Sequence, residues 1–385
     1  MKSLLTRETS GQKLIPQIDG LRFIAIAAVV AYHINGFVFQ RTSFYESAAI
    51  ESDPICRFFA EGHTGVQLFF VISGFILGLP FAKHYIDDGK RVALSHYFTR
   101  RIVRLEPPYI IAMTLTLVAL VATKGMQLFE LLPHYFASLL YIHYFVYGTG
   151  STLIGAAWSL EIEVQFYMMA PLLAQVFSIS SVSTRRAALI LGIVVCGLFQ
   201  YGVEYPAHSP MHGWTILSSL HWFFAGFLLA DLYVVGELSP STCPVLWDVV
   251  GSAAWAAIWC VVYFRFHIHV LLPFLILLAY AVAFKGRLYK SALSTSWVYI
   301  IGGMCYTIYL YHSMIKAIVG GRTTVVQLGV SPGSESIVQC LLISLPIVIV
   351  CSVLFVVAEK PFMSRKMFQR IMLFFGIAKP TQDGK

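Results

Sequence analysis

Two residues with the chemistry of a catalytic or anion-binding site share one apolar segment near the N-terminus. Arg22 and His33 are eleven residues apart in a run that opens at Asp19. On a helix this spacing is about three turns, so both side chains lie on one face, roughly 16 Å apart along the axis. An imidazole is a suitable general base near neutral pH, and a guanidinium binds phosphate groups. Two plainer interpretations stay open: Arg22 extends toward water with Asp19 as its partner, and His33 hydrogen-bonds a neighbouring helix.

A carboxylate lies inside a second apolar segment, which begins with Trp-Ser-Leu-Glu-Ile-Glu at 158–163. Trp158 is of a type common at the membrane surface and Glu161 can face water, whereas Glu163 is about one and a half turns farther in. We expect Glu163 and His33 at one depth, where a carboxylate can orient an imidazole base and stabilise its charged form.

Three arginines, Arg100, Arg101 and Arg104, form a basic loop ahead of a third apolar segment. Because a guanidinium grips phosphate with two hydrogen bonds, the group predicts a clamp for a nucleotide-containing ligand. The alternative is a role in membrane orientation or in contact with anionic lipids.

Two other segments contribute further candidates. Tyr309 and His312 belong to a tyrosine-rich segment in which Lys316 lies one turn beyond His312. Residues at this spacing share a helix face. Ser73 belongs to a Phe-Phe-Val-Ile-Ser-Gly-Phe motif at 69–75, which by itself indicates close helix packing.

The elements that must position these residues are membrane helices. Of the 385 residues, 58% are hydrophobic and 12% are charged, and the mean hydropathy is +0.74. An average soluble domain has about 25% charged residues, so this composition excludes a soluble enzyme and a disordered or fibrous protein. Long unbroken apolar runs favour helices over the short alternating segments of a membrane β-barrel.

Ten segments are apolar and long enough to span a bilayer, which needs about 20 residues. These segments are 19–40, 63–80, 105–122, 158–177, 187–203, 214–235, 246–264, 269–284, 297–318 and 337–358. Segment 131–147 is apolar but short, so we expect it to be re-entrant or interfacial. The sequence therefore predicts an all-α bundle of about ten transmembrane helices, with one domain over residues 1–385 and no separate soluble domain.

The distribution of positive charge predicts the orientation. If the N-terminus is cytoplasmic, the inner segments hold 20 Lys and Arg residues and the outer loops hold 5, which is a strong positive-inside bias. We therefore expect both termini in the cytoplasm. Topology accounts for most of the net charge of +8, so no nucleic-acid partner is expected. The seven cysteines lack any ligand spacing, and no metal site is expected either.

Six motifs, taken in order along the chain, resemble acyltransferase family 3, whose members are membrane enzymes that acylate bacterial cell-surface sugars and related lipids elsewhere. The motifs are Asp-Gly-Leu-Arg with its His at 19–33, the Ser73 motif at 69–75, Arg-Arg-x-x-Arg-x-x-Pro at 100–107, Trp-Ser-Leu-x-x-Glu-x-x-Phe-Tyr at 158–167, Tyr-x-x-Tyr-Leu-x-His at 306–312 and Glu-Lys-Pro at 359–361.

The resemblance implies a reaction and a set of roles. The donor would be cytoplasmic acyl-CoA, usually acetyl-CoA, and the acceptor a hydroxyl of a carbohydrate or lipid-linked sugar at the outer face of a bacterial inner membrane. His33 would be the catalytic base, with Glu163 at the family's acidic position. The donor-binding residues would be Arg22, Arg100, Arg101 and Arg104.

Two other function classes stay open. A proton-coupled transporter of a small anionic or sugar substrate would use His33, Glu163, His312 and Lys316 as a proton relay. A membrane sensor would bind acyl-CoA without turnover. Transfer or hydrolysis of acetyl-CoA by the purified protein separates the acyltransferase from both.

The charge bias generates a test of topology. Lys90→Cys and His208→Cys should be accessible from opposite sides of the membrane, because residue 90 lies in an inner segment and residue 208 in an outer one. In a background whose exposed native cysteines are replaced by serine, an impermeant thiol reagent applied outside should label only position 208. Labelling of both positions from one side would contradict the ten-span orientation.

Overall fold

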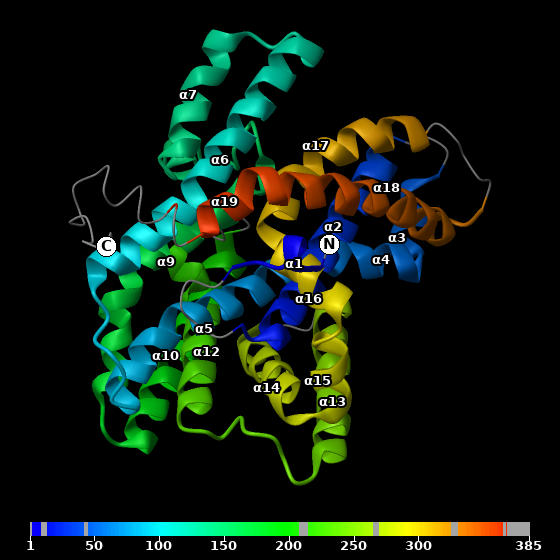
Figure 1. Cartoon of the computed structure of the whole chain (residues 1–385). Coiled ribbons are helices and arrows are strands. Elements are labelled where there is room, and N and C mark those ends of the chain that lie inside the picture. Colours follow the sequence, from blue (N-terminus) through cyan, green and yellow to red (C-terminus); the bar gives the residue numbers. More distant parts are fainter. Residues whose placement is uncertain are drawn as a thin grey trace.

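The computed structural model describes residues 2–8, 14–41, 45–207, 215–264, 269–324, 330–364 and 367. Position 208 and the C-terminal residues after 367, whose orientation the charge bias predicts, lie outside these ranges. Every regular element in the described residues is helical (Figure 1). The predicted all-α class is confirmed.

The long helices follow most of the predicted spans. They are α2 (Pro16–Arg41), α5 (Gly65–Ile86), α6 (Leu94–Lys124), α9 (Trp158–Leu173), α10 (Val182–Ala207), α12 (Ile216–Val234), α13 (Pro244–Tyr263), α14 (Leu272–Lys285), α17 (Cys305–Thr323) and α18 (Pro332–Leu354). Within the described ranges, seven helical stretches are long and apolar enough to cross a membrane, and nine are if two bent pairs each count as one span.

Short elements connect and extend these helices. They are α1 (Lys2–Leu5), α3 (Ser47–Ser52), α4 (Pro54–Ala60), η1 (Glu61–Thr64), α7 (Leu128–Leu139), α8 (His143–Tyr147), η2 (Gly155–Ala157), η3 (Ala174–Ser178), η4 (His269–Leu271), α15 (Arg287–Leu293), α16 (Ser296–Gly303), the π-helical turn η5 (Phe355–Glu359) and α19 (Lys360–Met363). The bent pairs are α14 with α15, at 87°, and α16 with α17, at 73°.

Two predicted segments differ in detail from continuous spans. The segment predicted at 158–177 is α9, of 16 residues, prolonged by the 3₁₀ turn η3. The segment at 131–147 divides into α7, of 12 residues, and α8, of 5 residues. Neither piece reaches the length of a span, which agrees with the prediction that this segment does not cross. In Figure 1, α7 and the second half of α6 project together from the rest of the bundle.

The arginines of the predicted basic loop lie on a helix instead. Residues 94–124 are all helical, so Arg100, Arg101 and Arg104 belong to the first turns of α6. Hydropathy marks where a chain leaves the apolar layer, and a helix can continue into water beyond that point.

Glycine contacts set the closest packing in the bundle. A Cβ atom added to Gly74 of α5 or to Gly226 of α12 would collide with backbone atoms of the other helix. Small residues permit this approach between membrane helices, so the packing interpretation of the motif at 69–75 is confirmed. Phe166 of α9 stacks on Phe223 of α12 beside this contact, with ring centroids 3.9 Å apart.

The apolar interior has two parts, and α2 contributes to both. Ile18 and Leu21 pack with buried residues of α5, α9, α10, α12 and α14. Ile26 and Ile34, farther along α2, pack with buried residues of α6, α17 and α18. Helix α2 therefore joins the two halves of the molecule and carries candidate residues into the space between them.

The glycine contact generates a prediction about stability. Gly226→Ala should lower the free energy of unfolding by about 1–3 kcal/mol, because the added methyl group overpacks a backbone contact. Gly202→Ala in α10 is the control, since nothing lies within 4 Å of the position of its Cβ atom. Thermal unfolding of the detergent-purified protein should show a lower midpoint for the first variant alone. An unchanged midpoint for Gly226→Ala would contradict the packing analysis.

Candidate functional site

A buried carboxylate organises the first turns of α2. Asp19 is 1% exposed, and its two oxygens accept hydrogen bonds from different guanidinium groups. Arg22 donates to Oδ1 and Arg7 to Oδ2, each at 2.7 Å. The structure thus gives Arg22 the partner expected from the sequence and adds Arg7, which the sequence analysis did not single out.

The positive charge around Asp19 exceeds its negative charge. Burial, followed by repulsion from Arg22, lowers the pKa of Arg7 to about 10, while Asp19 acts in the opposite direction. Arg104 on α6 also repels Arg7. An anion placed beside these arginines would relieve the repulsion.

The arginines of α6 face different surroundings. The guanidinium of Arg101 lies over the rings of Tyr97 and Tyr167, at 4.8 Å and 5.0 Å from their centroids. Its buried Nε has no hydrogen-bond partner among the described residues. Arg100 lies on the exposed side of the helix, so Arg101 and Arg104 are the two members of the group that point into the protein.

Glu163 lies between α9 and α5, where it meets Ser73. Its Oε1 accepts a hydrogen bond of 2.6 Å from the Ser73 hydroxyl and another from the hydroxyl of Tyr167. The charges of Glu163 and Arg22 also interact. Glu163 is thus adjacent to the arginine group, and we define the basic end of the site as Arg7, Asp19, Arg22, Arg101, Arg104 and Glu163.

A second group surrounds His33. The ring of His312, on α17, lies 5.0 Å from the ring of His33. Nδ1 of His312 is 3.0 Å from the carbonyl oxygen of Ile308 and 2.8 Å from that of Tyr309. Since both neighbours are acceptors, Nδ1 carries the proton, and Nε2 is an acceptor that lies 3.2 Å from the Ser313 hydroxyl. We call His33 and His312 the imidazole pair.

Two other side chains of α17 connect this helix to its neighbours. Lys316 donates from its amino group to the backbone oxygen of His33 at 3.2 Å. Tyr309 bonds through its hydroxyl to the carbonyl oxygen of Ala156 and lies 3.0 Å from the Ser159 hydroxyl. These contacts fix α17 against the start of α9, where Trp158 packs on the apolar interior.

No hydrogen bond joins Glu163 to His33 within the described part of the chain. The predicted depth of Glu163 assumed that Trp158 marks the membrane surface. The start of α9 is instead covered by α8 and η2, and Ala157 is fully buried. Glu163 therefore neighbours Arg22, and His312 takes the place beside His33.

Two acidic residues were missed as site candidates. Glu161, for which a water-facing position was one interpretation, is 2% exposed and accepts a hydrogen bond of 3.1 Å from the backbone of Tyr144. Glu359 is fully buried in η5, bonds to the hydroxyl and backbone of Thr307, and interacts with the charge of Arg104. Its place in the Glu-Lys-Pro motif, at the end of an apolar run, is the signal that marks it.

The two groups offer different chemistry at different points along α2. The basic end can hold an anionic group through several guanidinium groups, and the imidazole pair can accept and return a proton. Among the described residues, no three His, Cys, Asp or Glu side chains gather as a metal site would require.

The chain is similar to known acyltransferases over most of its length. The family model described as an acyltransferase domain matches residues 15–357. The peptidoglycan O-acetyltransferase OatA of Listeria monocytogenes is 25% identical over 279 residues, which cover 69% of this chain and 41% of that protein. A Bacillus subtilis protein named "Putative peptidoglycan O-acetyltransferase YrhL" is 28% identical over 53% of this chain and 31% of its own length.

A Staphylococcus aureus protein named "Putative O-acetyltransferase" is 26% identical over 62% of this chain and 39% of its own length. The chain thus spans about two fifths or less of each of these relatives. No solved structure matches it. Because the family model covers most of the chain, from α2 to η5, the protein belongs to the acyltransferase 3 family.

Proposed function

We propose that this protein is a membrane O-acyltransferase that moves an acyl group, acetyl in the first instance, from cytoplasmic acyl-CoA to a carbohydrate hydroxyl at the outer face. Membership of the acyltransferase 3 family supports the reaction class. Two relatives are named as peptidoglycan O-acetyltransferases, so peptidoglycan or a lipid-linked precursor sugar is the first acceptor to test.

The arrangement of α2 is the observation that carries this proposal. One helix holds Arg22 in the basic end and His33 in the imidazole pair. Their spacing of about 16 Å along the axis separates the two sites. A donor with phosphates at one end of a long flexible arm and a thioester at the other suits such a separation.

The basic end binds the donor. Arg22, Arg101 and Arg104, assisted by the exposed Arg100, would hold the phosphate groups of CoA through charge-assisted hydrogen bonds. Glu163 and Ser73 position this end, since Glu163 joins α9 to α5 and interacts with the charge of Arg22.

The imidazole pair performs the transfer. His33 takes the proton of the acceptor hydroxyl as its oxygen attacks the thioester carbonyl carbon. The carbon–sulfur bond then breaks, and the CoA sulfur leaves with a proton returned by the imidazolium. The acceptor nitrogen of His312 stabilises that imidazolium, because its Nδ1 is fixed on backbone oxygens.

The orientation follows from the charge bias and is part of the proposal. The basic end faces the cytoplasm, where acyl-CoA is made, and both termini lie on that side of a bacterial inner membrane. A transporter that relays protons is the alternative, since His33, His312 and Lys316 form one contact group. Acetyl transfer by the purified protein excludes it.

Removing the base should abolish turnover. His33→Ala should lower kcat for acetyl transfer by about 10²–10⁴-fold, the usual loss for a positioned base. Donor affinity should stay within a factor of two to three, because the phosphates bind elsewhere. Transfer of labelled acetyl from acetyl-CoA, with isothermal titration of CoA, measures both quantities.

His84→Ala is the matched control for that experiment, because His84 lies near the end of α5, away from both groups. There its Nδ1 lies 3.0 Å from the Gly89 backbone oxygen and its ring lies 4.8 Å from the ring of Tyr85. This variant should keep full activity. Full activity in His33→Ala would refute the assignment of the base.

Replacing an inward arginine should weaken donor binding. Arg101→Lys keeps the positive charge but loses the planar set of N–H donors that binds a phosphate through two hydrogen bonds. The KM for acyl-CoA should therefore rise about tenfold or more, while kcat changes less. Arg322→Lys is the control, since Arg322 is exposed and, within the described part of the chain, donates a hydrogen bond to the Ile318 backbone oxygen. A tenfold fall in kcat with an unchanged KM for acyl-CoA would contradict the donor-binding role and assign Arg101 a structural role.

A further inference from the structure

A groove on the flank of the bundle lies apart from the candidate site. It has a volume of about 220 Å³ and lies between the end of α12, α13 and α14. Its apolar wall consists of Leu232, Leu238, Phe274, Leu277, Leu278 and Ala281. Elsewhere on α13, Val245 and Val249 are 66% and 62% exposed, so this helix also presents apolar side chains at the surface. In a membrane protein such a surface meets lipid chains.

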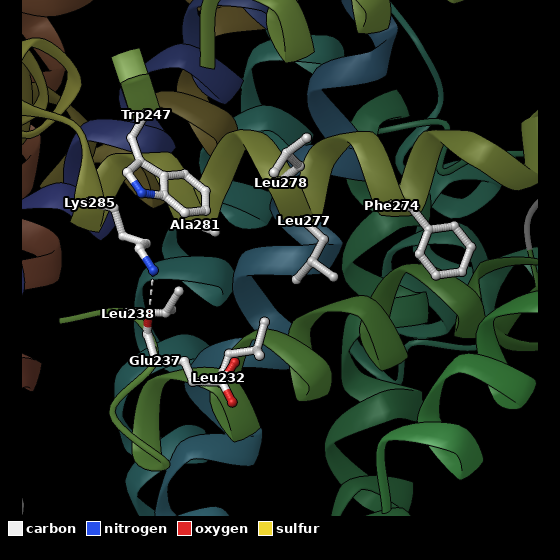
Figure 2. A pocket seen from close by; sticks show the side chains of 9 residues that line it. All are labelled: Leu232, Glu237, Leu238, Trp247, Phe274, Leu277, Leu278, Ala281 and Lys285. Atoms are coloured by element: carbon white, nitrogen blue, oxygen red, sulfur yellow. Dashed lines mark hydrogen bonds between the residues drawn. The ribbon is translucent and has the colours of Figure 1, made fainter. Parts of the chain in front are cut away.

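The groove has one apolar end and one charged end. Figure 2 shows Phe274 at one end and Trp247 with Lys285 at the other, joined along α14 by Leu277, Leu278 and Ala281. These α14 residues recur every three or four positions and form one helical stripe. The stripe from Phe274 to Lys285 is about 16 Å long, close to the half-thickness of a bilayer's hydrocarbon core.

The charged end holds a cation with no carboxylate partner. Lys285 donates to the backbone oxygen of Glu237 at 2.8 Å, and its amino group lies 4.3 Å from the ring centroid of Trp247. Across the described residues, Lys285 takes part in no ion pair. A tryptophan and a lysine at this depth are the usual anchors of a membrane interface.

The nearby carboxylates are already engaged. Glu237 accepts from Arg186 at 2.7 Å, and Asp231 is held by Arg185 and Arg186. Asp248 accepts from the backbone of Leu288 and Tyr289 at the start of α15.

The other charges near this end are positive. Arg287 and Lys290 on α15 are exposed beside it. The charged end therefore attracts an anion.

We propose that this groove is a binding site for an anionic phospholipid, with one acyl chain along the stripe and the phosphate group at Lys285. The charge bias assigns residues 236–245 and 285–296 to the cytoplasmic side, which is the leaflet where basic residues meet anionic lipid headgroups. The site is independent of the proposed acyl transfer, because the groove residues belong to neither the basic end nor the imidazole pair.

The test uses native mass spectrometry of the full chain, with phosphatidylglycerol and phosphatidylcholine of identical acyl chains as probes. The unmodified protein should retain phosphatidylglycerol in preference to phosphatidylcholine. Lys285→Gln should lower this preference about fivefold, the effect of one basic residue at a membrane surface. Leu277→Trp, which fills the groove, should remove the retention of both lipids.

Two controls separate the groove from general effects. Lys90→Gln removes an exposed lysine elsewhere, and Leu191→Trp adds the same ring on α10, where Leu191 is 62% exposed. Both should bind lipid as the unmodified protein does. Equal retention of the two lipids, or unchanged retention in Leu277→Trp, would overturn the proposal. Because Lys285→Gln is a surface change, it tests the site even if Leu277→Trp unfolds.

Discussion

The buried carboxylate of Asp19 is the interaction on which the candidate site depends. A charged side chain in a membrane costs about 3 kcal/mol or more unless it is paired or solvated. Asp19 lets two guanidinium groups lie together inside the protein, one from α2 and one from the segment before it. Without it, Arg7 and Arg22 would repel each other at the point where α2 enters the bundle.

Backbone packing holds this ion pair in place. A Cβ atom at Gly302 of α16 would collide with the carbonyl oxygen of Asp19, so α16 lies directly against the first turn of α2. The chain then bends by 73° into α17, which runs on to bring His312 beside His33. The bend thus allows one covalent segment to support both the basic end and the imidazole pair.

Much of the fold could be predicted from the sequence, because membrane helices are recognisable by their long apolar runs. The class, most of the spans and the set of candidate residues follow from hydropathy and from costly polar groups within apolar runs. The pairing of Ser73 with Glu163 could not be predicted, since it depends on how α5 and α9 pack. The hydrogen bonds of Glu163 to Ser73 and Tyr167, in place of one to His33, could not be predicted either, because η2 and α8 cover the start of α9 and no local sequence pattern indicates such cover.

Helix α2 packs in both parts of the apolar interior. Rocking of one half of the bundle against the other, the motion by which many carriers expose a site alternately to each side, would have to break one of these contact surfaces. This packing favours a bundle whose two halves keep their relative positions. In the proposed reaction the donor and the acceptor would then reach opposite faces separately. Only the acyl group, carried on the flexible arm of the donor, would pass between them, in contrast to a carrier that moves a whole solute.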